Sequence, residues 1–444
     1  MVDEITNKAN IDSAESVLPD TPQHGHVPVV IVGGGQAGLS TSWFLKQKGI
    51  GHVVLEKNRI GHAWREERWD SFCLVTPNWQ CTLPDYPYTG NDPDGFMLKD
   101  EIVAYLEGFA RKVDPPIHEG VTVTKITRAP DGIFRVATTK GEWTTDHVVM
   151  AISGYHVPAI PRVGERFPLD LFQMHSQAYR NPEQIPDGEV LIVGTGQSGC
   201  QIAEDLHWAG RKVHIAVGDA PRSPRKYRGK DTIKWLDEMG YYEMTVDTHP
   251  LGTEVRKKAN HYFTGRNGGH EIDLRQFAAE GVKLYGMLDK VDGDIVTFKP
   301  DLAQNLESAD KVYLRIRKMI DDYIAQNGID APEEPPYVPP WQVTEEPTRL
   351  SLTESNIKAV IWSTGFRADF SMVEMPVFDG RGYPGHIRGV TPVPGLYFVG
   401  LGWLWTWGSG RFSGIAEDAR HVATTIGGRY WAVDLAGAPR TRVA

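Results

Sequence analysis

A glycine-rich turn that occurs twice in the same local context constrains this chain more than any other feature. The first copy is Gly33-Gly34-Gly35-Gln36-Ala37-Gly38 and the second is Gly194-Thr195-Gly196-Gln197-Ser198-Gly199. Each follows a short apolar run rich in β-branched residues, Val27–Val32 or Val190–Val193, and each precedes an apolar helical stretch. A strand, a G-x-G-x-x-G turn and a helix open a βαβ unit, so the sequence predicts two parallel sheets of the dinucleotide-binding type.

The first turn is typical of a site for FAD. In such a turn Gly33 permits the tight bend, Gly35 lets the backbone approach a pyrophosphate, and Gly38 lets the helix pack against the strand. Glu56 follows the second strand, His52–Leu55, where a carboxylate accepts hydrogen bonds from ribose hydroxyls and repels a 2′-phosphate. The residues predicted to hold FAD here are Gly33, Gly35, Gln36, Ala37, Gly38, Glu56 and Lys57.

The second turn favours a nicotinamide cofactor. No acid ends its second strand, Lys212–Val217, and a basic cluster of Arg222, Arg225, Lys226 and Arg228 follows. Guanidinium groups bind a 2′-phosphate through charge-assisted hydrogen bonds, which favours NADPH. Asp219, which follows the strand, keeps NADH as a possible cofactor. The alternative interpretation of the basic cluster is a solvated loop with no phosphate-binding role. The residues predicted to hold NADPH are Gly194, Gly196, Gln197, Ser198, Gly199, Arg222 and Arg225.

The fold class expected is α/β, with two Rossmann-like dinucleotide-binding domains and the FAD domain built from both ends of the chain. We expect a disordered tail over residues 1–26, the first part of the FAD domain over 27–161 and its second part over 341–444. The NAD(P)H domain, with a helical insertion, is predicted over 162–340, where a proline-rich linker ends it. The further elements predicted are strands Val121–Ile126, Phe134–Ala137, Trp143–Met150, Ala359–Ser363 and Gly395–Val399, and helices Asp310–Ile324 and Ser413–Ile426.

Composition excludes several classes of function. The chain of 444 residues has a net charge of −10, which argues against nucleic-acid binding. It has no apolar run long enough to span a membrane. Its three cysteines include no C-x-x-C pair, which argues against a disulfide framework or a metal site and favours a cytoplasmic protein.

Several motifs resemble those of the class B flavoprotein monooxygenases, which include the flavin-containing and YUCCA-type enzymes. The resemblance runs from about Val27 to Ile426. It rests on Gly61-His62-Ala63-Trp64, on the stretch 74–84 that ends in Cys-Thr-Leu-Pro, on 361–366 (Ile-Trp-Ser-Thr-Gly-Phe) and on 395–400 (Gly-Leu-Tyr-Phe-Val-Gly). The resemblance implies further cofactor contacts from Gly61, Trp64, Thr364, Gly365 and Gly400.

The resemblance also implies catalytic residues. The family signature between the two domains is matched in part, with Leu169 and Leu171 in place of Phe and Gly, and with His175 and Tyr179 in their expected positions. Tyr179-Arg180 is similar to the hydroxylating branches. Asn78 corresponds to a family Asn that hydrogen-bonds the flavin–oxygen adduct. A structural linker histidine and a turn-forming asparagine are the alternatives for His175 and Asn78.

Three alternate tryptophans suggest where a substrate binds. Trp403, Trp405 and Trp407 lie among glycines in a segment that is near the flavin in similar proteins. They predict an aromatic wall for a hydrophobic or aromatic substrate, with simple sheet packing as the alternative.

The resemblance implies that NADPH reduces FAD and that reduced flavin forms a C4a-(hydro)peroxide with O2, which transfers one oxygen atom to a small molecule. The rivals are a Baeyer–Villiger or decarboxylating oxygenase, an NAD(P)H oxidase or disulfide reductase, and a non-catalytic nucleotide sensor. The prediction includes no partner other than substrate and O2, and leaves room for a homodimer.

Overall fold

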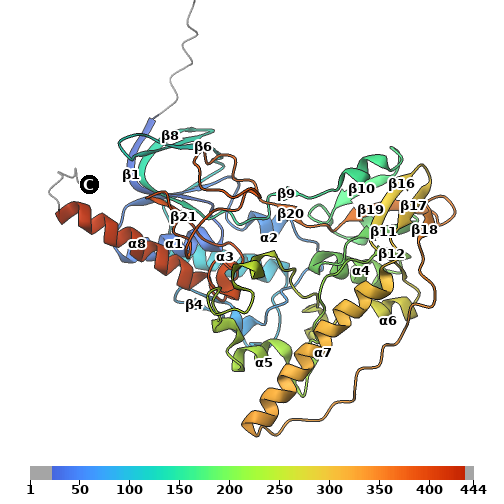
Figure 1. Cartoon of the computed structure of the whole chain (residues 1–444). Coiled ribbons are helices and arrows are strands. Elements are labelled where there is room, and N and C mark those ends of the chain that lie inside the picture. The colour runs from blue at the N-terminus through green and yellow to red at the C-terminus, as the bar shows by residue number, and fades with distance from the viewer. Residues whose placement is uncertain (1–22, 436–444) are drawn as a thin grey trace, which may run out of the picture.

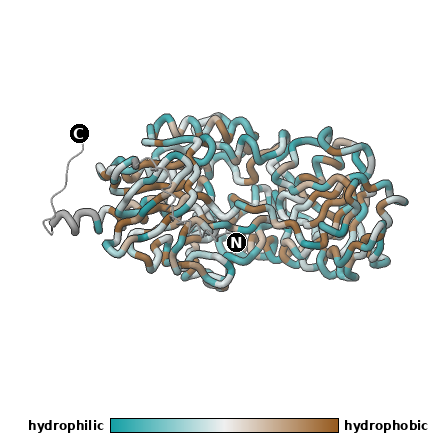
Figure 2. Tube along the Cα trace, turned by 90° about the horizontal axis from the view of Figure 1, so that it is seen from above, coloured by the Kyte–Doolittle hydropathy of each residue, from teal (hydrophilic) through white to brown (hydrophobic). Residues whose placement is uncertain are grey.

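The computed structural model describes residues 23–435, which form two lobes. In Figure 1 the first lobe holds β1, β8 and α8, and the second lobe holds β11, α4 and α7. Figure 2 shows that apolar residues gather in the interior of each lobe separately. Each lobe therefore has its own hydrophobic core, as expected of two domains.

The first lobe contains a seven-stranded sheet that is parallel in its centre. β8 pairs with β1 and β21 in parallel and with β7 in antiparallel fashion, so both ends of the chain contribute strands. The strands in order are β5 (Ile117–Glu119), β2 (His52–Glu56), β1 (Gln23–Val32), β8 (Gly141–Met150), β7 (Phe134–Thr138) and β6 (Val123–Arg128), with β21 (Leu396–Phe398) beside β8.

Helices cover one face of this sheet. Alternate strand residues such as Ile31, Val54 and Val149 pack in one core with α1 (Gln36–Gln47), α3 (Lys99–Val113) and α8 (Ile415–Leu435). Their neighbours along the strands pack on the other face. This alternation follows from the two-residue period of a strand that is buried on both faces.

The second lobe contains a five-stranded, all-parallel sheet. Its order is β10 (Phe172–His175), β19 (Ile357–Trp362), β11 (Glu189–Val193), β12 (Val213–Ala216) and β15 (Lys283–Tyr285). One face packs on α4 (Gln197–Trp208), α6 (Leu274–Ala279) and the start of α7 (Leu302–Asn327). The other face is covered by the small sheet β16 (Leu288–Asp292), β17 (Ile295–Phe298) and β18 (Arg349–Ser351).

The predicted domain boundary at residue 340 is wrong. β18 and β19 lie after it, yet both pair within the second lobe. The proline-rich segment joins α7 to β18 and lies along α7, where Arg317 donates to the carbonyl oxygen of Pro335 at 2.6 Å. The chain returns to the first lobe after Trp362, where β20 (Phe366–Arg367) runs antiparallel to the outgoing β9 (Val157–Pro158).

Element bounds also differ at several ends. β1 begins at Gln23, so residues 23–26 of the expected tail are in the sheet; the rest of that tail lies outside the described residues. α1 and α4 begin inside the glycine turns, because Gly35 and Gly196 serve as their N-caps. α7 starts eight residues earlier than predicted and ends as expected at Gly328, which is left-handed.

The helical insertion lies between β12 and β18. α5 (Thr232–Glu238) follows the hairpin of β13 (Lys226–Tyr227) and β14 (Lys230–Asp231), and packs on α7 through the buried Trp235. Two short turns, η4 (Tyr241–Glu243) and η5 (Gly252–Lys257), then extend towards the first lobe. Within residues 23–435, no helix has the length and apolar character needed to cross a bilayer.

Candidate functional site

The first glycine turn has the shape of a pyrophosphate cradle. Gly33 has a φ of 105°, which favours glycine. A Cβ added to Gly38 would lie 1.9 Å from the carbonyl oxygen of Gly33, so only glycine lets α1 approach β1 this closely. A Cβ on Gly35 would meet nothing within 4 Å. The space before Gly35 is therefore open to a ligand, next to the N-terminus of α1.

The second turn repeats this geometry. Gly194 has a φ of 101°, and a Cβ on Gly199 would lie 2.0 Å from the carbonyl oxygen of Gly194. A Cβ on Gly196 would meet nothing within 4 Å. Gln197 and Ser198 begin α4, as Gln36 and Ala37 begin α1. The residues present thus fit two dinucleotides, one in each lobe.

The end of the second strand distinguishes the two cradles. The carboxylate of Glu56 accepts hydrogen bonds from the backbone N–H groups of Gly34 (2.6 Å) and Asn58 (2.8 Å), which fixes it beside the first turn. In the second lobe Gly218 takes this place and donates to the hydroxyl of Thr195 at 3.0 Å. A carboxylate therefore ends the second strand beside the first cradle, whereas beside the second cradle Gly218 is at this place and the exposed Asp219 follows it. Lys57 is exposed.

Arg222 and Arg225, which were predicted to bind a 2′-phosphate, are buried and paired with carboxylates in the structure. Arg222 is 1% exposed and forms ion pairs with Asp273 at 2.8 Å and Asp310 at 3.2 Å. Arg225 is also 1% exposed and pairs with Asp231 at 2.8 Å. A guanidinium that is buried and neutralised by carboxylates is less available to an incoming phosphate, so the ion pairs favour a structural role for both arginines. The acids that pair with Arg222 come from distant segments, whereas Asp231, which pairs with Arg225, is only six positions away along the chain.

The chain returns to the first cradle after β21. A Cβ on Gly400 would lie 2.8 Å from the Cβ of Ala37, and Gln36 donates from Nε2 to the carbonyl oxygen of Gly410 at 3.4 Å. Residues 400–410 therefore lie against the N-terminus of α1, as predicted for a late segment that contacts the cofactor site.

The GxxW motif joins the same region. Gly61 is the left-handed N-cap of α2 (His62–Glu66). The ring of Trp64 stacks on Phe412, with 5.6 Å between ring centroids. The motif thus supports the segment that follows the tryptophan-rich stretch.

The three tryptophans are not equivalent. Trp403 is 8% exposed and packs on Val246 and Val255 of the insertion, so it cannot form a substrate wall. Trp405 and Trp407 are half-buried, and the Trp407 ring lies 4.5 Å from that of Tyr242 in η4. The insertion is fixed here by a hydrogen bond from the N–H of Val246 to the carbonyl oxygen of Trp405 (2.8 Å). The wall predicted from sequence is reduced to Trp405 and Trp407.

His175 lies where the chain crosses between lobes. Its Nε2 donates to the carbonyl oxygen of Gly365 at 2.9 Å, and its Nδ1 accepts from the N–H of Gln177 at 3.2 Å. The hydroxyl of Thr364 donates to the carbonyl oxygen of Ala159 at 2.6 Å in the same crossing. Because both ring nitrogens have hydrogen-bond partners, the structure favours the alternative of a structural linker histidine for His175.

This arrangement predicts a pH dependence. Burial lowers the pKa of His175 below its ordinary value of 6.5, against the hydrogen bond to Gly365. Between the lowered pKa and 6.5 the unfolded chain binds a proton that the folded protein does not. The free energy of unfolding should therefore decrease as the pH falls through 6.5. Urea unfolding at pH 7 and pH 5 should show a smaller decrease for His175→Gln; equal decreases would contradict this role.

Tyr179 and Asn78 are also structural. Tyr179 is fully buried and its hydroxyl donates to Asp205 at 2.7 Å. Asn78 is 4% exposed and uses both ends of its amide, donating to the carbonyl oxygen of Asp92 and accepting from the N–H of Met97. In this structure both side chains have internal hydrogen-bond partners, which favours structural roles over the predicted catalytic ones.

Tyr179→Phe should reduce stability without changing turnover. Asp205 would keep Ser71 and Arg266 as partners but lose one hydrogen bond in a buried place. We expect a loss of about 1–3 kcal/mol in the free energy of unfolding and an unchanged kcat. Tyr88→Phe, which removes a hydroxyl without a partner in the described part of the chain, is the control. A large decrease in kcat at wild-type stability would restore the catalytic assignment.

One side chain near the site was missed by the sequence reasoning. Arg411 follows the short turn η7 (Trp407–Gly410), and its guanidinium lies 3.9 Å from the centre of the Trp407 ring. A signal did exist, because an arginine just before a long helix opposes the positive end of the helix dipole. An arginine in such an unfavourable position is therefore a candidate functional residue.

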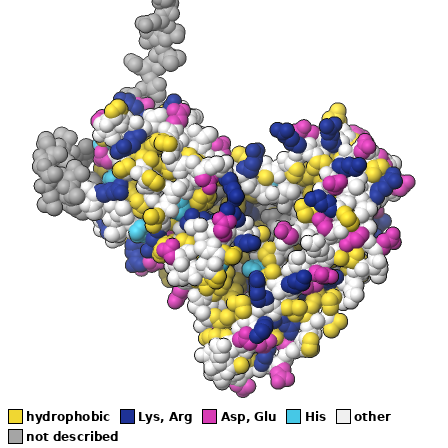
Figure 3. Space-filling model, in the orientation of Figure 1, with side chains coloured by type: hydrophobic (Ala, Val, Ile, Leu, Met, Phe, Trp, Pro, Cys, Tyr) yellow, Lys and Arg dark blue, Asp and Glu magenta, His cyan; other side chains and the backbone are white. Residues whose placement is uncertain are grey.

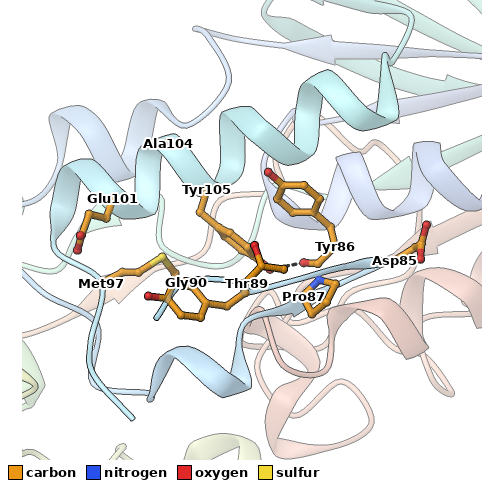
Figure 4. Close-up of a pocket in the computed structure, with 10 residues that line it drawn as sticks. Asp85, Tyr86, Pro87, Thr89, Gly90, Met97, Glu101, Ala104 and Tyr105 are labelled. Carbon is orange, nitrogen blue, oxygen red and sulfur yellow. Dashed lines mark hydrogen bonds between the residues drawn. The ribbon is translucent and has the colours of Figure 1, made fainter. Parts of the chain in front are cut away.

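A separate open hollow lies on the first lobe (Figure 4). It has a volume of about 380 Å³, and Tyr105 there donates to the carbonyl oxygen of Tyr86 at 2.6 Å. None of the residues that line it belongs to either glycine turn or to the tryptophan-rich stretch. It is therefore a surface feature apart from the cofactor cradles.

The chain is similar to known proteins over both lobes. The family described as pyridine nucleotide-disulphide oxidoreductase matches residues 30–283. Oxidoreductase CzcO-like of Geobacillus kaustophilus is 33% identical over 404 residues, which are 90% of this chain and 98% of that protein. Indole-3-pyruvate monooxygenase YUCCA6 of Arabidopsis thaliana is 32% identical over 223 residues, 47% of this chain and 53% of the plant protein. A flavin-containing monooxygenase from Stenotrophomonas maltophilia shares the fold with a TM-score of 0.64, at 19% identity over 91% of this chain and 99% of that one.

Proposed function

We propose that this chain, which belongs to the pyridine nucleotide-disulphide oxidoreductase family, is a monooxygenase. It is a flavin-dependent oxidoreductase with FAD and NADPH as cofactors. It transfers one oxygen atom from O2 to a small hydrophobic or aromatic substrate, and the second atom leaves as water.

The single observation that carries this proposal is the pair of open cradles in a chain whose thiols are all buried. Two dinucleotides provide a path for electrons from a nicotinamide to a flavin. Cys73, Cys81 and Cys200 are free and buried. Burial raises the pKa of Cys73 to about 11 and that of Cys81 to about 12, and it raises the pKa of Cys200. The thiolate that a disulfide reductase needs is therefore disfavoured at neutral pH, which supports O2 over a disulfide as the proposed electron acceptor.

The side chains and backbone of this protein have definite roles in the proposal. The N-termini of α1 and α4 bind the two pyrophosphates, and Glu56 accepts a hydrogen bond from the FAD ribose. Trp405 and Trp407 exclude water from the substrate side. Flavin, when bound, supplies the redox chemistry that activates O2. Free, buried cysteines fit the reducing cytoplasm as the place of action.

An isotope experiment tests the proposal. Enzyme that NADPH has reduced in the absence of oxygen is mixed with ¹⁸O2 and a panel of amines, sulfides, ketones and 2-oxo acids. The isotope content of the products is then measured by mass spectrometry. We expect one ¹⁸O atom in one product class, which also separates hydroxylation from Baeyer–Villiger or decarboxylating chemistry. Stoichiometric H2O2 with every compound would instead identify an NAD(P)H oxidase. A flavin that NADPH does not reduce would identify a nucleotide sensor.

A further inference from the structure

Arg411 is a cation without a carboxylate partner. It is half-buried and donates from Nη2 to the side-chain oxygen of Asn260 at 2.8 Å and from Nη1 to the carbonyl oxygen of Trp407. No Asp or Glu among residues 23–435 lies within ion-pair distance of it, whereas Arg222, Arg225 and the buried Arg275 all have one. A partly desolvated cation of this kind favours an anionic ligand.

The position of Arg411 is central to the proposed site. Its neighbour Gly410 accepts a hydrogen bond from Gln36 of the first cradle. Its neighbour Phe412 stacks on Trp64. Asn260, which holds its guanidinium, comes from the insertion of the second lobe. Arg411 therefore lies where the first cradle, the tryptophan-rich stretch and the second lobe meet. The space-filling view in Figure 3 shows a notch between the two lobes.

A second unpaired arginine belongs to the same aromatic surface. The guanidinium of Arg68 lies 5.1 Å from the centre of the Trp64 ring and 5.6 Å from that of Phe72. Its Nη1 donates to the carbonyl oxygen of Glu67 at 2.8 Å. Burial lowers the pKa of Arg68 and of Arg411. Glu67 and then Tyr155 oppose this for Arg68, whereas only tyrosines, with Tyr155 first, oppose it for Arg411. Arg68 thus lies on the ring of Trp64, which stacks on Phe412 next to Arg411, and neither guanidinium has a carboxylate within ion-pair distance in the described part of the chain.

We propose that Arg411 is the specificity-determining residue that binds the carboxylate of an aromatic substrate, with Arg68 as the second cation of the same site. The inference rests on the proposed function, whose substrate it restricts to anions. Trp407 and Asn260 hold the guanidinium flat, which leaves its remaining N–H groups free for a planar carboxylate. The half-buried rings of Trp405 and Trp407 contact the aromatic part.

The test uses a binding probe rather than turnover, so it is independent of whether the enzyme oxygenates. FAD-loaded protein is titrated with 2-naphthoate and with its neutral isostere 2-naphthamide, and binding is followed by the change in flavin absorbance. We expect the wild type to bind naphthoate about tenfold or more tightly than naphthamide. Arg411→Gln should abolish this preference and leave naphthamide binding unchanged. Arg411→Lys, which keeps the charge, should restore part of it.

Matched variants keep the outcome decisive. Arg420→Gln removes an exposed arginine of α8 that pairs with Glu417, and should behave as the wild type. If Arg411→Gln does not fold, Arg68→Gln should still weaken naphthoate more than naphthamide. Equal binding of the two probes by the wild type, or a preference that survives in Arg411→Gln, would overturn the proposal. Loss of FAD from Arg411→Gln would also overturn it, because Arg411 would then be a cofactor ligand.

Discussion

Replacing Gly35 with aspartate should give a folded protein that purifies without flavin. Gly35 has a φ of −78° and a ψ of −172°, which any residue can adopt, and a Cβ there meets no protein atom within 4 Å. The new carboxylate therefore fits the protein but occupies the space of the FAD pyrophosphate and repels it. We expect FAD affinity to fall by about 100-fold or more, equivalent to about 2.7 kcal/mol.

The measurement is the ratio of FAD to protein after purification and after titration with excess FAD. Circular dichroism and urea unfolding of the apoproteins should match the wild type, since no contact is lost. A Gly35→Asp protein that retained FAD at wild-type affinity would mean that the first cradle does not hold the flavin.

Replacing Gly196 with aspartate should give the opposite phenotype, a yellow protein that NADPH no longer reduces. Gly196 also has an ordinary backbone, with a φ of −66° and a ψ of 178°, and open space before it. The added carboxylate repels the pyrophosphate of the nicotinamide cofactor and leaves the first lobe untouched. At limiting NADPH, flavin reduction should slow by about 100-fold or more.

Stopped-flow mixing with NADPH under anaerobic conditions measures this rate. Chemical reduction by dithionite and reoxidation by O2 should be unchanged, because neither needs the second cradle. The two aspartate variants serve as controls for each other, since each should lose one cofactor and keep the other. Loss of flavin from Gly196→Asp with normal NADPH binding would reverse the assignment of the cradles.

The fold class, both glycine turns, the resemblance to class B flavoprotein monooxygenases and the two cofactors were predicted correctly from sequence. These predictions succeeded because the signals are local. A glycine that must have a positive φ, such as Gly33, or that must pack without a Cβ, such as Gly38, is constrained by its immediate neighbours.

The structure gives the candidate catalytic and phosphate-binding residues partners that the sequence did not indicate. Tyr179 and Asn78 hydrogen-bond to distant groups in the interior, and Arg222 is paired with acids about 50 and 90 positions away along the chain. The sequence alone does not show whether an arginine is buried beside a carboxylate or free at the surface. The two cases differ in whether the folded chain brings a carboxylate from a distant segment next to the arginine.

By itself, the sequence determined that two dinucleotide cradles would form, since the chemistry of a phosphate turn is contained in six consecutive residues. Only the tertiary structure decided which cations remain unpaired, which tryptophan is covered, and where the chain passes between the lobes. Those outcomes depend on contacts between segments hundreds of residues apart, such as Gln36 with Gly410, and no local pattern records them.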